Sequence, residues 1–412
     1  MSMQETISAE RIHIAWFGMR NAGKSSLVNA VTGQDVSIVS DVPGTTTDPV
    51  RKAMELLPLG PVLILDTPGL DDEGELGALR VARTAKILAQ TDIAVLTVDI
   101  TAGWSPENRE LLAEIVSRGI PYVIAYTKSD LADEAMRAAR QREAAEAAGN
   151  RGAEKSPVVF TSAKTAEGIH DLKELLGTFA PKVAREKMIL TDLVEPGSTV
   201  VLVTPIDSSA PKGRLILPQQ LVLRELLDAH CRAMVCQPEE LAETLSVLKT
   251  PPALVVMDSQ AFAKVQAIVP EDVPLTSFSI LFARYKGSLA TLVGGAETID
   301  RLRPGQKVLI AEGCTHHRQC EDIGTVKLPS WIEKRCGFRP EFAFTSGGDF
   351  PEDLSEYALV IHCGGCTLPE REVARRLAIA EAAGVPMTNY GVAIAYMNGI
   401  LRRSIAVFAE KA

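Results

Sequence analysis

The chain has 412 residues, of which 46% are hydrophobic and 23% charged, and its formal net charge at pH 7 is -9. This length exceeds what one hydrophobic core usually organises, so two or three globular domains are expected, and the composition excludes a disordered or fibrous chain. The acidic balance argues against broad nucleic-acid binding, and no uninterrupted apolar run reaches the roughly 18 residues of a membrane span, so we expect a cytoplasmic protein.

The first third of the chain alternates short apolar runs with amphipathic segments. This rhythm predicts parallel strands covered by helices, with ligands at the carboxyl ends of the strands. Helices are expected from Lys24, over 134–149 and over 171–179, and strands within the runs 12–18, 62–69, 93–99, 123–130 and 158–164. We therefore predict a first domain at 8–178, followed by a charged linker at 179–197.

The remaining chain is again α/β in pattern, and no internal repeat is evident at a fixed period. A second domain is predicted at 198–285, with a helix over 219–236 and strands over 199–207, 253–259 and 275–280. A third is predicted at 286–412, with a helix over 369–384 and strands over 307–314, 341–347 and 357–366. The expected fold class is α/β throughout, in three consecutive units.

A phosphate-binding motif follows the first predicted strand. The segment from Gly18 to Ser25 fits G-x-x-x-x-G-K-[ST] and directly precedes a helix, as the motif requires. Gly18 and Gly23 let backbone N–H groups surround the phosphates, Lys24 reaches the β and γ oxygens, and the Ser25 hydroxyl joins magnesium. Ser26, the next residue of the predicted helix, is also predicted to bind the nucleotide. The sequence therefore predicts a P-loop domain, in preference to a plain glycine turn.

Two further motifs stand at later strand ends. Asp66 begins a D-T-P-G segment, where the carboxylate can hold magnesium through water and Gly69 can present its amide to the γ-phosphate. Thr127, Lys128 and Asp130 belong to T-K-S-D, in which Asp130 can accept two hydrogen bonds from guanine.

The tripeptide Ser162, Ala163 and Lys164 can supply a backbone donor to the guanine oxygen. Four motifs in this order predict an enzyme that binds GTP or GDP with Mg²⁺ and hydrolyses GTP.

The segments 18–31 and 41–50 are similar to the translation-factor-like GTPases typified by MnmE and Era. The resemblance implies that Thr46 is the switch threonine that joins magnesium, with Thr45 or Thr47 as alternatives. It also implies that Asn21 helps to hold K⁺ beside the phosphates, although Asn21 is equally suited to form a turn. Thr127 departs from the family, which usually has asparagine there.

Cysteine and histidine residues gather at two predicted strand ends in the last third. Cys314 and His316 follow one strand, and His362, Cys363 and Cys366 follow another. Because both strand ends face the same crevice of an α/β sheet, the side chains can converge on a metal. Zinc and an iron–sulfur cluster both suit this donor set, and a group of half-buried thiols is the alternative.

Over its whole length the chain resembles the HydF family, the maturation GTPases of [FeFe]-hydrogenase. The resemblance implies a [4Fe-4S] cluster on the thiolates of Cys314, Cys363 and Cys366, with His316 and His362 near the fourth iron. It further implies a homodimeric scaffold that receives a di-iron precursor from radical-SAM maturases and delivers it to the hydrogenase apoprotein. Neither nucleic acid nor membrane is expected as a partner.

Two other functions remain open at this level. One is a zinc-stabilised regulatory GTPase, and the other is an MnmE-like tRNA-modification GTPase. Cys231 and Cys236 are interpreted as buried thiols on the amphipathic helix predicted over 219–236, with no metal role.

Overall fold

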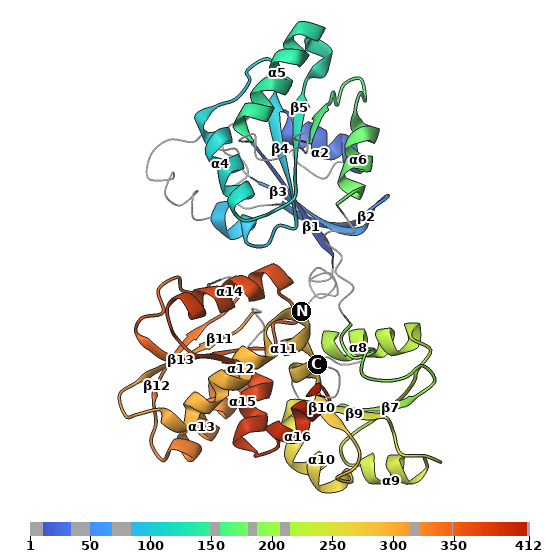
Figure 1. The fold of residues 1–412 in the computed structure, drawn as a ribbon, viewed down its shortest axis with the longest axis vertical. Helices are drawn as coiled ribbons and strands as arrows, with labels where there is room; N and C mark the ends of the chain where they lie inside the picture. Colours follow the sequence, from blue (N-terminus) through green and yellow to red (C-terminus); the bar gives the residue numbers. More distant parts are fainter. Residues whose placement is uncertain are drawn as a thin grey trace. The chain divides into compact units, whose positions relative to one another are not determined.

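The computed structural model describes residues 11–33, 50–67, 84–148, 157–179, 188–206, 215–313, 322–347 and 349–409. The chain divides into two compact units, Glu10–Arg185 and Glu186–Ala412, which are described separately (Figure 1). Among the described residues, no helix has the length and apolar character needed to cross a membrane.

The first unit is built on a six-stranded sheet with the order β2-β3-β1-β4-β5-β6. Only β2 runs antiparallel to its neighbour, β3. The strands are β1 (Ile12–Gly18), β2 (Val50–Leu56), β3 (Gly60–Asp66), β4 (Ile93–Asp99), β5 (Tyr122–Thr127) and β6 (Val158–Phe160). The helices are α2 (Lys24–Thr32), α4 (Pro106–Ser117), η1 (Ser129–Leu131), α5 (Glu134–Ala147) and α6 (Ile169–Gly177).

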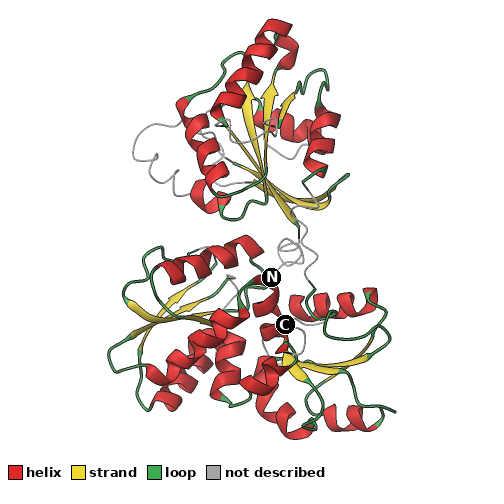
Figure 2. Cartoon of the chain, viewed as in Figure 1, coloured by secondary structure: helices red, strands yellow, loops and turns green. Residues whose placement is uncertain are grey.

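Helices cover both faces of this sheet, which is why its central strands are apolar along their length. Leu27 of α2 and Leu172 of α6 share a buried cluster with Trp16 of β1. Leu112 of α4 and Ala144 of α5 belong to the cluster on the other face. In Figure 2, α2 with α6 and α4 with α5 lie on opposite sides of the strands. The carboxyl ends of β1, β3 and β5 are thereby left for ligands.

The second unit contains two four-stranded parallel sheets. The first has the order β10-β9-β7-β8, with β7 (Thr199–Val203), β8 (Arg232–Cys236), β9 (Leu254–Met257) and β10 (Leu275–Ser277). The second has the order β12-β11-β13-β14, with β11 (Lys307–Ala311), β12 (Glu341–Thr345), β13 (Tyr357–His362) and β14 (Met387–Asn389).

The helices of this unit connect and cover the two sheets. Those of the first half are α8 (Leu217–Asp228), α9 (Leu241–Ser246), η2 (Ser259–Ala261), α10 (Phe262–Ile268), α11 (Phe278–Lys286), α12 (Leu289–Ala296) and η3 (Glu297–Arg301). Those of the second half are η4 (Ile323–Lys327), α13 (Leu328–Cys336), α14 (Glu370–Ala382), α15 (Tyr390–Met397) and α16 (Leu401–Ala406).

The two sheets of the second unit have the same strand topology. In each, the first strand is central, the second strand pairs on one side of it, and the third and fourth follow on the other side. The registers also agree, because Val203 pairs with Met257 as Ala311 pairs with His362. The sequence nevertheless shows no repeat at a fixed period. The separation between equivalent residues changes along the chain, since the connections differ in length.

The two halves exchange helices with one another. Helix α12 of the first half packs against β14, and α16 of the second half packs against β10. Helices α11 and α15 cross between them, where a Cβ added to Gly391 would lie 2.2 Å from the Ser279 Cβ. Each half thus contributes one helix to the sheet of the other, as the two subunits of a two-fold symmetric dimer do. One buried hydrophobic cluster contains residues of both sheets.

Three predictions about this unit were wrong in detail. The helix expected over 219–236 ends at Asp228, and Cys236 lies in strand β8 while Cys231 precedes it. His230, with φ 58°, turns the chain between them. The strand expected over 275–280 ends at Ser277, whose side chain caps α11 by accepting from the Ile280 N–H.

Part of the predicted linker at 179–197 is packed against the second unit. The Glu225 carboxylate of α8 accepts the backbone N–H groups of Ile189, Leu190 and Thr191 at 2.9–3.1 Å. Leu190 is fully buried. An apolar segment with its N–H groups satisfied in this way behaves as part of the fold, although its composition resembles a linker.

Candidate functional site

The nucleotide site lies where β1 meets α2. A Cβ added to Gly18 would lie 2.6 Å from the Thr97 carbonyl oxygen, and Gly23 has φ 79°, so both positions require glycine. Asn21 also has a positive φ of 60°, which asparagine tolerates. Within the described residues, no side chain caps the start of α2 at Gly23. The first N–H groups of the helix therefore point toward the position of a phosphate.

Lys24 and Asp66 are brought together from different strand ends. The Lys24 Nζ lies 2.5 Å from the Asp66 Oδ1, and both side chains are largely buried. The pair joins the phosphate-binding lysine to the carboxylate that the sequence assigns to magnesium. Ser25 and Ser26 follow Lys24 in the first turn of α2. The other two predicted residues of this centre, Thr46 and Gly69, lie outside the described residues.

The residues predicted to recognise the base lie at the ends of β5 and β6. Asp130 is held by Ser162, whose Oγ donates to the Asp130 Oδ1 at 2.7 Å, and this hydrogen bond lowers the pKa of the Asp130 carboxyl. Asp130 is therefore kept as a charged acceptor. Lys128 has a left-handed backbone and its Nζ contacts the Asp99 carboxylate at 2.5 Å. Ala163 and Lys164 follow Ser162 in the exposed turn after β6.

Glu167 belongs to this site and was missed by the sequence analysis. Its carboxylate accepts from the Ser129 Oγ at 2.7 Å and from Arg137 at 2.7 Å. Arg137 also donates to the Ser129 carbonyl oxygen. The three residues tie the loop after β5 to the loop after β6. No motif marks Glu167, because the pairing depends on the tertiary position of α5.

Thr127 ties the base loop to the P-loop. Its Oγ1 donates to the carbonyl oxygen of Ala22 at 2.5 Å, and both residues are buried. The hydroxyl thus provides a donor at the position where related GTPases have an asparagine amide. This hydrogen bond connects the loop after β5 directly to the P-loop.

We expect Thr127→Val to weaken GDP binding by about tenfold, because a buried carbonyl without its donor costs about 1–3 kcal/mol. The loss should appear as faster release of a fluorescent GDP analogue. Thr178→Val is the matched control, since that exposed hydroxyl bonds only within its own helix turn at Leu175 among the described contacts. Equal release rates in all three proteins would contradict the role given to Thr127.

The thiol site lies at the carboxyl ends of β11 and β13. Cys363 follows β13, and its Sγ accepts from the backbone N–H of Gly313 at 3.0 Å and of Gly365 at 3.4 Å. A Cβ added to Gly313 would lie 2.8 Å from the Leu368 side chain, so a larger residue there would displace Leu368. Cys314 and His316 lie outside the described residues, but Gly313, which precedes Cys314, contacts the sulfur of Cys363.

Burial keeps both described thiols in their neutral form. It raises the pKa of Cys363, and it raises the pKa of Cys366 to about 11. A metal that binds them as thiolates would therefore displace protons. In the described part of the chain no three His, Cys, Asp or Glu side chains form a metal-binding group, and the predicted third thiol lies beyond it.

His362 is held by its neighbours through both ring nitrogens. The ring Nδ1 lies 2.6 Å from the Cys363 carbonyl oxygen, so it donates there, and Nε2 accepts from the Arg376 guanidinium at 3.0 Å. Burial and the nearby Arg376 charge lower the pKa of His362 to about 4, so the ring is neutral. The Nε2 lone pair is occupied in this arrangement. Binding of iron by His362 would require Arg376 to move.

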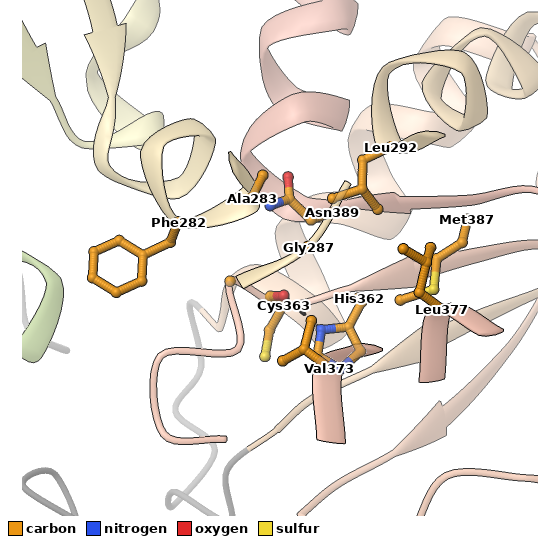
Figure 3. Close-up of a pocket in the computed structure, with 11 residues that line it drawn as sticks. Phe282, Ala283, Gly287, Leu292, His362, Cys363, Val373, Leu377, Met387 and Asn389 are labelled. Carbon is orange, nitrogen blue, oxygen red and sulfur yellow. Dashed lines mark hydrogen bonds between the residues drawn. The ribbon is translucent and has the colours of Figure 1, made fainter. Parts of the chain in front are cut away.

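Arg376 is itself a fully buried cation. Its Nε donates to the Glu372 carboxylate at 2.8 Å and its second terminal nitrogen to the Gly347 carbonyl oxygen at 2.6 Å. The side chains of Arg376 and Glu372 are 1% and 3% exposed, so the pair is shielded from water. A small apolar pocket adjoins His362 and Cys363, with Val373 of α14 beside the imidazole (Figure 3).

Three family models match consecutive parts of the chain. Residues 13–128 match a 50S ribosome-binding GTPase model, 189–287 the hydrogen maturase F dimerization domain, and 290–407 the hydrogen maturase F tetramerization domain. The two hydrogen maturase F models together span more than half of the 412 residues. The chain belongs to the hydrogen maturase F (HydF) family. The predicted family and the α/β fold class are thus confirmed, and the two HydF oligomerisation domains imply a homo-oligomer.

The chain spans less than half the length of the curated relatives named here. GTPase Der of Kosmotoga olearia is 32% identical over 182 residues, which are 42% of this chain and 40% of Der. The tRNA modification GTPase MnmE of Chromobacterium violaceum is 35% identical over 174 residues, which are 42% of this chain and 36% of MnmE. A crystal structure of Aquifex aeolicus Era is 19% identical, covers 62% of this chain and 97% of Era, and has a TM-score of 0.37.

Proposed function

We propose that this chain is a GTP-hydrolysing scaffold that binds a [4Fe-4S] cluster and delivers a di-iron precursor to [FeFe]-hydrogenase. In this proposal the precursor comes from radical-SAM maturases, and the chain works as a homodimer or a higher homo-oligomer. The GTPase domain comprises residues 8–178, and the dimerisation and cluster-binding domains begin at 198 and 286. The single observation that carries the proposal is the position of Cys363 and Cys366, which follow β13 at the topological switch point of the second sheet in a chain of the HydF family.

Hydrolysis of GTP is supported by the geometry of the first unit. The P-loop backbone, the pairing of Lys24 with Asp66 and the held carboxylate of Asp130 together provide phosphate, magnesium and guanine contacts. Thr46 and the Gly69 amide are proposed to complete the site on the γ-phosphate side. Asn21 is proposed to bind K⁺. Its left-handed backbone agrees equally with the simpler role of forming the P-loop turn.

Cluster binding is supported by the position of the thiol site. The chain leaves β11 toward β12 on one side and later adds β13 on the other, so the crevice between β11 and β13 is the topological switch point. Ligands of open α/β sheets bind at this place. The segments that end in Gly313 and begin with Cys363 flank it, and the backbone N–H groups that point at the Cys363 sulfur suit a metal-bound thiolate.

The residues present therefore fit a cluster held by Cys314, Cys363 and Cys366. A cluster on three thiolates leaves one iron with an exchangeable position, at which a di-iron unit could be held during transfer. His316 is proposed to lie near that iron. His362 is proposed to act through its contacts, because its ring fixes the Cys363 carbonyl and meets Arg376.

Replacing Cys363 or Cys366 should abolish cluster binding without affecting GTP hydrolysis. We expect the full chain, reconstituted anaerobically with iron and sulfide, to hold about four irons and to release phosphate from GTP. Cys363→Ser and Cys366→Ser should lose most of the iron and keep GTP turnover, since the nucleotide site lies in the other compact unit. Iron, sulfide and phosphate analyses measure this.

Cys336→Ser is the matched control, because Cys336 is a half-buried thiol of the same unit with its Sγ beside the Ile299 carbonyl oxygen. It should retain iron. Full iron content in both thiol-site variants would contradict the ligand assignment. Stoichiometric zinc without iron, in protein made anaerobically with iron supplied, would favour the zinc-stabilised regulatory GTPase instead.

A further inference from the structure

Lys286 is a buried lysine that points into the thiol loop, which we define as residues 363–368. It is the last residue of α11 and only 3% exposed. Its Nζ donates to the carbonyl oxygens of Leu368 at 2.9 Å and Cys366 at 3.2 Å, and lies 3.5 Å from that of Gly365. An ammonium group has three donors, and three loop carbonyls surround this one.

Lys286 positions the backbone of the thiol loop, so that carbonyl groups face the lysine and the Gly365 N–H group faces the Cys363 sulfur. Gly365 has φ 63°, and the Leu368 N–H closes a turn on the Gly365 carbonyl oxygen. Charge-assisted hydrogen bonds are the stronger kind, so this single side chain fixes the peptide groups on both sides of Cys366.

The duplication shows that this lysine comes from the other half of the unit. Ser277 and Asn389 cap α11 and α15 in the same way, which makes Asn398 the counterpart of Lys286. The Asn398 amide donates within its own segment, to the Ile394 carbonyl oxygen at 2.8 Å. Lys286 instead reaches from the half that lacks the thiol motif into the loop of the half that has it.

We infer that Lys286 is a positioning residue of the thiol site, supplied by the half of the unit that carries β7–β10, to fix the thiol loop and to balance the charge of a bound cluster. The inference rests on the proposed cluster. Thiolate ligands carry negative charge in a region shielded from water, where a nearby ammonium group stabilises them and favours the reduced cluster. The geometry makes the two halves parts of one composite site.

The test compares Lys286→Met with the wild-type chain and with Lys264→Met. Lys264 is 65% exposed and pairs with Glu239, so its replacement changes the net charge equally but leaves the loop intact. In the reconstituted protein, Lys286→Met should release iron to a chelator about tenfold faster, and its cluster should have a more negative reduction potential. Lys264→Met should match the wild type in both.

Metal-free protein provides a readout that does not depend on the cluster. Amide hydrogen exchange across residues 364–368 should be faster in Lys286→Met, because the carbonyl contacts that hold the turn are lost. If the Met variant fails to fold, Lys286→Gln keeps one amide donor and should give an intermediate effect. Unchanged loop exchange and unchanged iron release would overturn the inference. A wild-type chain that takes up no iron would overturn the proposed function, and the loop exchange would still decide the role of Lys286.

Discussion

Asp130→Asn should exchange a preference for guanine nucleotides for a preference for xanthine nucleotides. The Asp130 carboxylate offers only acceptors to the guanine edge, and its lowered pKa keeps it charged. An asparagine amide presents a donor in place of one acceptor, which opposes guanine but matches the additional carbonyl of xanthine. The loss of two hydrogen bonds to a charged group should weaken GDP binding by about 100-fold or more.

Competition between GDP and xanthosine diphosphate for a fluorescent analogue measures the exchange. Asp133→Asn is the matched control, since Asp133 lies nearby and caps α5 by accepting from the Met136 N–H, a role that asparagine fills equally well. Its nucleotide preference should remain that of the wild type. An Asp130→Asn protein that still prefers GDP would remove Asp130 from base recognition.

Arg376→Met should destabilise the second unit strongly. The substitution leaves the buried Glu372 carboxylate with Arg375 as its remaining described cation, and it removes the donors to His362 and to the Gly347 carbonyl oxygen. Breaking a buried pair from one side typically costs about 3 kcal/mol or more. For a unit of this size, the melting temperature should fall by about 10 °C.

Thermal unfolding of the metal-free chain, followed by circular dichroism, measures this loss. Arg339→Met is the control, because Arg339 pairs with Glu333 on the surface and such exposed pairs contribute about 0–1 kcal/mol. Similar melting temperatures for the two variants would show that the Arg376 network does not stabilise the fold.

The sequence predicts the nucleotide site well because its motifs are local. Gly18, Lys24 and Asp66 stand at strand ends, and parallel strands of one sheet bring their carboxyl ends together without further information. The hydrogen bond of Thr127 could not be predicted, since its partner is a backbone carbonyl oxygen, that of Ala22, 105 residues away in sequence. Glu167 was missed for the same reason.

In the second unit, sequence patterns predicted the strands better than their connections. The helix predicted over 219–236 was too long because β8 is a short edge strand, and its half-buried residues continue the apolar pattern of α8. The repeat was missed because unequal connections change its period. Lys286 gave no signal either, since a lone lysine at the end of a helix usually reaches solvent.

The exchange of helices between the two halves has a consequence for folding. Strand β14 is covered by a helix encoded before it, and β10 by one encoded near the end of the chain. A polypeptide that stops at residue 287 would lack α16, which packs against its fourth strand, and one that starts at residue 290 would lack Lys286 and α11, which packs against α15. The two regions that the family models separate therefore belong to one compact unit. We expect its first sheet to reach its final stability only after α16 has been synthesised.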